Sequence, residues 1–549
     1  MRRHAVLGHD AQGGGAGRTR ARLSGLTTLP ESRPRVPPWL LPLALAGVVG
    51  AFTLDGAFVF DDQAAILTSP VVQATVPWTE AFSRDFWGQP LGDARASWRP
   101  ALPLVWRGLW ALGDGAALPF RVLSLLLHVL ATGLVYRLGR RLGLTVGALV
   151  GASLFAVHPL RSEAVGAIVA QADVASTLFG LAAVLAIASE RPRALLAASA
   201  LAAGILFKES AVLFVAPVAA VAWLNAAGGP ERRRVLGRAA ASLAPTLLVA
   251  LLGTWMQFSF PRPAAGPADN LAFATEGLTR LLHGLAMAGK LTRFTLLPVG
   301  LSPHHGYAEV DDGLATLLPD AAIGLAALAL LLLLLVRAAR QRDWLALVLS
   351  TIALPVLVLQ SQLAVTLPTD LGERIGYGLL ATVGLGLGAA FERALDARAR
   401  RVATAALLAL SLAGSWVAQR PWSSEPALWD HALTVTPKAL RVQRNIAAMR
   451  FRDGRYEDGL WHLMVVVHLE SRLPAPVDWE PITALEAQPV GRRLGLGPGI
   501  LAPDAPCPFA LRWLNRAFRN PGEALERWEE MRALYGCPSL GGPTGAASR

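Results

Sequence analysis

Two adjacent aspartates are the leading candidates for chemistry in the sequence. Asp61 and Asp62 stand in the segment FVFDDQ (58–63), directly after the first long apolar run, roughly residues 38 to 54. That run is about long enough to cross a bilayer, so the two acids stand where a chain leaves a membrane. A carboxylate at such a place can take the proton of an attacking hydroxyl group. The alternative is a turn that caps a helix end, which is the usual role of an Asp pair.

Most other ionisable residues near the apolar runs fall on the same expected side of the membrane. Such residues are costly in or beside a bilayer, so they are candidates for function. Together with the acid pair they are Arg99, His158, Glu163, Lys208, Glu209, His304, His305, Glu373 and Arg374. This asymmetry indicates a catalytic cavity that faces one side, whereas an alternating-access transporter places its ions near the bilayer midplane.

Several of these residues also have a purely structural interpretation. Arg99 is a candidate anchor at the membrane interface, and His158 is a candidate helix cap. Lys208 and Glu209 are neighbours that can form a screened surface ion pair. The interpretation therefore depends on the partner that each side chain finds in the fold.

The roles of Asp173 and of the pair His304–His305 depend on which groups lie next to them in the fold. Asp173 stands at the expected outer entrance of a span, and a deeper position would require a cation, for which Arg161 is a candidate. The neighbours His304 and His305 do not predict a metal site, because adjacent side chains point apart in most backbones and no third ligand is suitably spaced.

The composition is that of a polytopic membrane protein. Of the 549 residues, 53% are hydrophobic and 16% are charged, against about 25% charged in soluble proteins. The formal net charge is +12, but the arginines cluster at the ends of apolar runs, which follows the positive-inside rule and does not indicate nucleic-acid binding. We therefore expect an all-α membrane protein with no nucleic acid partner.

Alternation of the arginine-rich ends predicts about 11 transmembrane helices. Residues 1–37 are expected to form a disordered basic cytoplasmic tail, 38–419 a polytopic membrane domain, and 420–549 a helical region on the outer side. The stretch 281–300 is expected to be re-entrant or interfacial, because a single crossing would break the alternation. The stretch 100–112 suits an interfacial helix.

The outer region has spacings like those of a tetratricopeptide repeat (TPR). Asn445, Gly454, Tyr456 and Pro474 fall at positions of its helix–turn–helix, although generic helical hairpins fit nearly as well. We expect a small TPR-like α-helical outer domain that presents the acceptor.

The only two cysteines of the chain, Cys507 and Cys537, also stand in this region. An even number of cysteines in an oxidising compartment indicates a disulfide, here between the two ends of a helical pair from Phe509 to Leu534. The alternative is two free thiols in a cytoplasmic tail, which requires the topology to be wrong by one span.

A series of short motifs follows the order seen in a known family. They are FVFDDQAAIL (58–67), SWRP (97–100), a helix ending in His128, FAVHPLRSEAV (155–165), QADV (171–174), LFKES (206–210), LSP-x-x-x-Tyr (301–307) and GERIGY (372–377). Together they resemble the transmembrane and tetratricopeptide-repeat (TMTC-like) protein O-mannosyltransferases, which have the wider C-type glycosyltransferase (GT-C) fold. The resemblance spans about residues 50 to 470, and the acidic pair of the family's first outer loop matches Asp61 and Asp62.

The chain departs from the family pattern at three places. Gln171 stands two positions before Asp173, where the family usually has an Arg directly before the Asp. Leu160 and Arg161 follow the His-Pro pair, and Ile375-Gly-Tyr-Gly378 replaces the usual Leu-Tyr-Leu-Pro. These departures concern the sugar and the acceptor more than the chemistry.

The resemblance implies a membrane glycosyltransferase that moves a sugar, typically mannose, from a polyprenyl-phosphate donor to a Ser or Thr hydroxyl of an acceptor protein. A lipid phosphate leaves as a stabilised anion, so one base is sufficient and the stereochemistry inverts, unlike in hydrolases with two carboxyls. Asp61 is the expected base, with Asp62 orienting it or binding the sugar. No cofactor and no metal are expected.

The remaining site residues divide into two groups. Cations are expected to hold the donor phosphate, because a guanidinium can grip two phosphate oxygens; these are Arg99, Lys208 and Arg374. Sugar or acceptor binding is assigned to His158, Glu163, Asp173, Glu209, Tyr307 and Glu373.

Two other functions stay open on the sequence alone. One is a C-type transferase that glycosylates lipid or polysaccharide, and the other is a non-enzymatic membrane scaffold with a TPR-like binding domain. The Arg- and Ala-rich, Lys-poor composition fits a GC-rich bacterial genome. We therefore expect the inner (plasma) membrane of a bacterium, with the N-terminus cytoplasmic and the C-terminus periplasmic.

Overall fold

The computed structural model describes residues 37–91, 97–189, 191–226, 232–259, 270–306 and 314–453, and a few positions from there to 466. Within these residues the chain is helical, and its only β-pairings are two isolated bridges, Arg84–Pro90 and His305–Leu371. The predicted all-α class is confirmed.

Sixteen α-helices are described within these residues, and 3₁₀ helices and one π-helix (η1) stand between several of them. The α-helices are α1 (Leu40–Ala51), α2 (Ala101–Gly113), α3 (Leu118–Arg141), α4 (Val146–Val157), α5 (Ser162–Gly166), α6 (Gln171–Ile187), α7 (Ala194–Phe207), α8 (Val215–Ala226), α9 (Arg232–Phe258), α10 (Gly277–Leu296), α11 (Leu314–Gln341), α12 (Trp344–Ser361), α13 (Tyr377–Ala394), α14 (Ala397–Gln419), α15 (Glu425–Val435) and α16 (Leu440–Arg452). The short elements are η1 (Gln63–Leu67), η2 (Trp78–Phe82), η3 (Pro159–Arg161), η4 (Ile168–Ala170), η5 (Glu209–Phe214), η6 (Leu271–Phe273), η8 (Glu373–Gly376) and η9 (Arg420–Ser423).

Each apolar run that we expected to cross the membrane forms a helix. Six of the described helical segments are long and apolar enough to cross, namely Leu118–Arg141, Ile168–Ile187, Thr316–Gln341, Trp344–Ser361, Glu373–Ala394 and Ala397–Ser423. Five shorter apolar helical segments accompany them. The chain is thus an integral membrane protein, while the total of about 11 spans stays a prediction.

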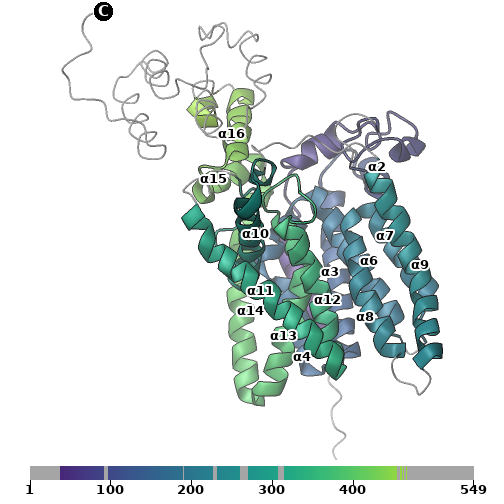
Figure 1. The fold of residues 1–549 in the computed structure, drawn as a ribbon. Coiled ribbons are helices and arrows are strands. Elements are labelled where there is room, and N and C mark those ends of the chain that lie inside the picture. Colours follow the sequence, from purple (N-terminus) through teal and green to yellow (C-terminus); the bar gives the residue numbers. More distant parts are fainter. Residues whose placement is uncertain are drawn as a thin grey trace, which may run out of the picture.

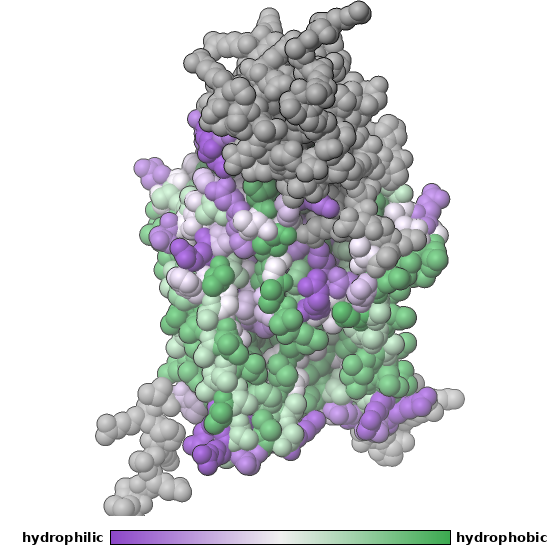
Figure 2. All heavy atoms as spheres, turned by 90° about the vertical axis from the view of Figure 1, so that its left-hand side faces the viewer, coloured by the Kyte–Doolittle hydropathy of each residue, from purple (hydrophilic) through white to green (hydrophobic). Residues whose placement is uncertain are grey.

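The helices differ in how much of their surface faces the outside of the bundle. In α6, 78% of the most apolar stretch is buried, against 17% in α11 and 11% in α14. Leucines and valines of the peripheral helices are exposed, among them Leu330, Leu333 and Leu410. Figure 2 shows such side chains as a broad hydrophobic belt with hydrophilic residues gathered near both ends of the bundle, which is the surface expected of a membrane domain.

Glycines bring α4 and α13 into close antiparallel contact. A Cβ atom added at Gly151 would lie 2.7 Å from the carbonyl oxygen of Gly384, and one added at Gly388 would collide with Gly147. Small residues four apart let two membrane helices pack backbone against backbone. The contact places His158, just after α4, beside the start of α13, which follows η8, the short helix that contains Arg374.

One end of the bundle collects the ends of many helices. α4 and α7 finish there, α6 and α13 begin there, and α2, α15 and α16 lie over the same end (Figure 1). The segments that connect these helix ends carry nearly all the candidate site residues. Of the predictions made above, those on residues 1–36, Tyr307, Gly454, Tyr456, Pro474, Cys507 and Cys537 lie outside the described residues.

Candidate active site

The two aspartates of the FVFDDQ segment have different environments. The Asp62 side chain is fully buried; its Oδ1 accepts the N–H of Val169 at 2.9 Å and its Oδ2 accepts the N–H of Val59 at 3.2 Å. Burial raises the pKa of Asp62 to about 6, against the opposing effects of the Arg121 charge and the backbone hydrogen bonds. Asp62 therefore anchors its loop to η4, and its side chain does not cap η1, the helix that it precedes.

Asp61, in contrast, is only partly buried. Burial raises the pKa of its carboxyl above the ordinary value, and three nearby guanidinium groups oppose this rise. They belong to Arg374, Arg441 and Arg99. A carboxylate with a raised pKa that faces several cations, at one end of a membrane bundle, has the features of a general base beside an anion-binding site.

We expect Asp62→Asn to weaken folding. An amide side chain has a single carbonyl acceptor, so one of the two backbone N–H groups would face an NH₂ group, and leaving a buried donor unpaired costs about 1–3 kcal/mol. Thermal unfolding of the purified protein in nanodiscs measures the change. Asp55→Asn is the control, because Asp55 is exposed in the same loop. Equal stability of the Asp62 variant and the wild type would contradict the anchoring role.

Arg374 is the centre of a network of ion pairs. Its Nη1 lies 2.8 Å from Oε1 of Glu163, its backbone N–H donates to Oε2 of the same carboxylate at 2.8 Å, and its Nε lies 3.8 Å from Oδ2 of Asp173. Asp173 also binds the Nζ of Lys208 at 2.6 Å. Asp173 thus has two cationic partners, and Arg161, the candidate suggested by the sequence, instead donates to Gln419 at 3.0 Å.

Arg99 and Glu209 form a second, two-pronged ion pair. The Arg99 Nε donates to Oε2 at 3.0 Å and its Nη2 donates to Oε1 at 2.8 Å. Glu209 therefore pairs with a residue 110 positions away and not with its neighbour Lys208. The surface-pair interpretation of Lys208 and Glu209 is wrong, because each binds a different partner.

Glu373 and His158 have local structural partners. One carboxylate oxygen of buried Glu373 accepts the backbone N–H of Ser302 and contacts Nε2 of His305, each at 2.7 Å. The Nδ1 of His158 accepts the N–H of Leu160 at 3.2 Å and caps η3, and burial lowers the pKa of this imidazole to about 4. Both side chains fix the loops that surround the ion-pair network.

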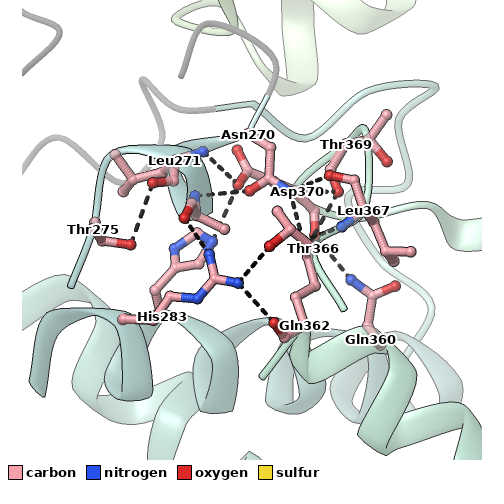
Figure 3. A network of polar contacts seen from close by, with 12 residues as sticks. Asn270, Leu271, Thr275, His283, Gln360, Gln362, Thr366, Leu367, Thr369 and Asp370 are labelled. Carbon is pink, nitrogen blue, oxygen red and sulfur yellow. Dashed lines mark hydrogen bonds and ion pairs between the residues drawn. The ribbon is translucent and has the colours of Figure 1, made fainter. Parts of the chain in front are cut away.

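A buried polar network fixes the loop that leads into Arg374 (Figure 3). Asp370 lies 3.1 Å from Nε2 of His283 on α10 and accepts the N–H of Leu271 at 3.0 Å. The side chains of Gln360 and Gln362 donate to the Asp370 carbonyl at 2.8 and 2.6 Å. The following residue, Leu371, pairs with His305, so the network and the His305–Glu373 contact together set the position of the Arg374 backbone.

Sequence reasoning missed two arginines of this region. Arg121 is fully buried and donates to the carbonyls of Gly166 and Ala57, close to Asp62. A charged residue in the first turn of an apolar helix was a signal that could have found it. Arg441, on α16, carries no such signal, because it stands among other arginines in a polar stretch.

Comparisons with known proteins agree with the order of motifs. A family model of dolichyl-phosphate-mannose-protein mannosyltransferases matches residues 99–256. The protein O-mannosyl-transferase Tmtc2 of Drosophila melanogaster is 34% identical over 275 residues, which cover 47% of this chain and 29% of that protein. The chain is a relative of the TMTC protein O-mannosyl-transferases. The resemblance predicted from the motifs is thereby confirmed.

Other TMTC relatives match shorter segments. Tmtc1 of Drosophila melanogaster is 39% identical over 145 residues, 26% of this chain and 17% of that protein. Human TMTC3 is 32% identical over 146 residues, 26% of this chain and 16% of that protein. The chain thus spans less than a third of the length of these relatives. No solved structure matches it.

Proposed function

We propose that the chain is a membrane glycosyltransferase that moves a sugar, by analogy with its relatives mannose, from a polyprenyl-phosphate donor to a Ser or Thr hydroxyl of a protein. The observation that carries this proposal is Asp61, a carboxylate with a raised pKa beside Arg374 and Arg99, at one end of the bundle. The names of the family model and of the TMTC relatives support the choice of reaction.

Asp61 takes the proton of the acceptor hydroxyl as its oxygen attacks the anomeric carbon. The bond from that carbon to the donor phosphate oxygen breaks, and the electron pair leaves with the polyprenyl phosphate. The configuration inverts in this single displacement. Asp61 ends protonated and returns its proton to water.

Arg374 is suited to the donor phosphate. Its side chain is 25% exposed, and its hydrogen bonds to Glu163 use the backbone N–H and Nη1, so another prong of the guanidinium can serve a phosphate oxygen. Arg99 and Lys208 add positive charge nearby. We assign to Glu163, Asp173 and Glu209, which pair with these cations, the role of orienting them, in place of direct sugar or acceptor binding.

The experiment that tests the function follows a labelled sugar. Membranes that contain the protein receive radiolabelled polyprenyl-phosphate mannose, and the products are separated. Label in protein supports the proposal. Label in lipid or polysaccharide would assign the site to the other C-type reaction, and no transfer would favour the non-enzymatic scaffold.

We further propose that the acids face the outer side of a bacterial inner membrane, with a cytoplasmic N-terminus and residues 420–549 periplasmic. The relatives named above are animal proteins, so the bacterial setting rests on composition alone. Intact cells treated with a membrane-impermeant maleimide test the orientation. We expect Cys507 and Cys537 to react only after reduction, as a periplasmic disulfide would. Labelling that requires broken membranes would contradict the topology.

A further inference from the structure

The residues on both sides of the acid pair are held by the C-terminal helices α15 and α16. The ring of Phe60 meets the indole of Trp429 edge to face, with centroids 4.9 Å apart and planes at 87°. The Nε2 of Gln63 donates to Oε2 of Glu425 at 2.5 Å. Arg452 completes this contact by donating to Oε1 of Gln63 at 3.1 Å and to Oε1 of Glu425 at 2.7 Å. The helical pair therefore holds the loop at Phe60, one residue before Asp61, and at Gln63, one residue after Asp62.

The contact between Phe60 and Trp429 is continuous with the hydrophobic core of the helical pair. Trp429 is fully buried in a cluster of residues from both helices, and Phe60 packs against that cluster. Phe60 has φ of 52°, a left-handed conformation that is unfavourable for a non-glycine residue. Such a conformation persists only when the surroundings determine it. The contact with Trp429 is part of these surroundings. By holding Phe60, it sets the direction of the neighbouring Asp61 side chain.

Helix α15 and the residue that follows it also bind the loop that contains His304 and His305. His431 Nε2 lies 2.9 Å from the carbonyl oxygen of Leu301. The hydroxyl of Thr436 lies 3.1 Å from that of Ser302 and donates to the His304 carbonyl at 3.2 Å. The described part of the outer region is thus packed against the site and joined to it at several points.

We infer that the helical pair α15–α16 is a component of the active site, in which Trp429 and Glu425 are positioning residues for the loop that carries Asp61. The expected effect on catalysis rests on the proposed function. The contacts that hold the loop do not depend on that function. The outer region therefore has a role beyond the presentation of an acceptor. Arg441, at the start of α16, also contributes positive charge near Asp61.

The test compares Trp429→Ala, Trp429→Phe and Glu425→Ala in the full-length protein. Trp416→Ala is the matched control, because Trp416 is 49% exposed on neighbouring α14. We expect Trp429→Ala and Glu425→Ala to lower kcat at least about tenfold, since small misplacements of a catalytic group reduce rates steeply. KM for donor and acceptor should change less than about twofold. Trp429→Phe, which keeps an aromatic edge for Phe60, should restore most of kcat.

Hydrogen exchange of residues 58–67 gives a readout that is independent of activity. We expect faster exchange there in Trp429→Ala and Glu425→Ala, wild-type exchange in Trp416→Ala, and near-wild-type exchange in Trp429→Phe. Wild-type exchange in both alanine variants would overturn the inference, as would a rise in acceptor KM with kcat unchanged. If the wild-type protein transfers no sugar, the proposed function fails, and the exchange data alone still decide whether the helical pair holds the loop.

Discussion

We expect Asp61→Asn to abolish transfer nearly completely and to leave the fold intact. A general base contributes about 10²–10⁴-fold to a rate, so we expect kcat to fall by about that factor, with the melting temperature close to that of the wild type. Asparagine has nearly the same shape but cannot accept the hydroxyl proton. Single-turnover transfer from a labelled polyprenyl-phosphate sugar to a Ser-containing peptide measures the loss.

Two comparisons sharpen this prediction. Asp55→Asn, in the same loop but exposed, should transfer sugar like the wild type. In the proposed mechanism the base is the ionised form of Asp61, and burial raises its pKa, so wild-type kcat should fall as pH is lowered, with a midpoint above the ordinary value of about 3.9. Activity of Asp61→Asn within tenfold of the wild type would rule out Asp61 as the base.

Arg374→Gln should impair both donor use and stability. The donor phosphate would lose the guanidinium prong, and we expect kcat/KM for the donor to fall by about 10²-fold or more, as for other preorganised electrostatic contacts. Glu163, only 2% exposed, would lose its main partner. Breaking a buried ion pair by removing one member costs about 3–5 kcal/mol.

The stability loss should depend on pH. Burial already raises the pKa of Glu163 to about 7, and the charge of Arg374 opposes the rise, so the pKa in the variant should be higher still. A folded-state pKa above the unfolded value means that the variant is least impaired at acid pH, where Glu163 is neutral in both states. The wild type shares the loss of stability between about pH 4.3 and its own folded-state pKa of about 7, so the deficit of the variant relative to the wild type should grow only above about pH 7, towards the higher pKa of the variant.

Arg293→Gln is the matched control for Arg374→Gln. Arg293 pairs with Asp320 at 3.1 Å, and both side chains are more exposed than Glu163. Its loss should change stability by less than about 1 kcal/mol, which is typical of exposed pairs, and should leave donor use unchanged. Equal effects of the two variants would mean that the ion-pair network has no special relation to the donor.

The sequence was sufficient to predict the helices, because an apolar run of membrane length is informative without its surroundings. The partners of the charged residues were not predictable in the same way. Lys208 has extended backbone angles, with φ of −161° and ψ of 138°, so its side chain and that of Glu209 point apart. They bind Asp173 and Arg99, which stand on separate elements.

The different roles of Asp61 and Asp62 were also beyond the sequence. One of the two N–H groups that bind Asp62 belongs to Val169, 107 positions away, and no local sequence pattern predicts such a contact. The contribution of α15–α16 was missed for the same reason. A repeat-like spacing predicts helices but does not indicate which surface they bind, and the contact between Phe60 and Trp429 exists only after both segments are in place.

The contact between α16 and the loop that carries Asp61 and Asp62 has a consequence for biosynthesis. Gln63 and its partner Arg452 are separated by 389 residues, and a ribosome adds about 5–20 residues per second. After the acid loop has been synthesised, about 20–80 seconds therefore pass before the last of its supports exists. During this time the emerging protein has Asp61 and Asp62 but not the helices that hold their loop in position. We therefore expect a half-made chain in the membrane to be a poor catalyst, and the proposed sugar transfer to begin only when synthesis has passed the end of α16.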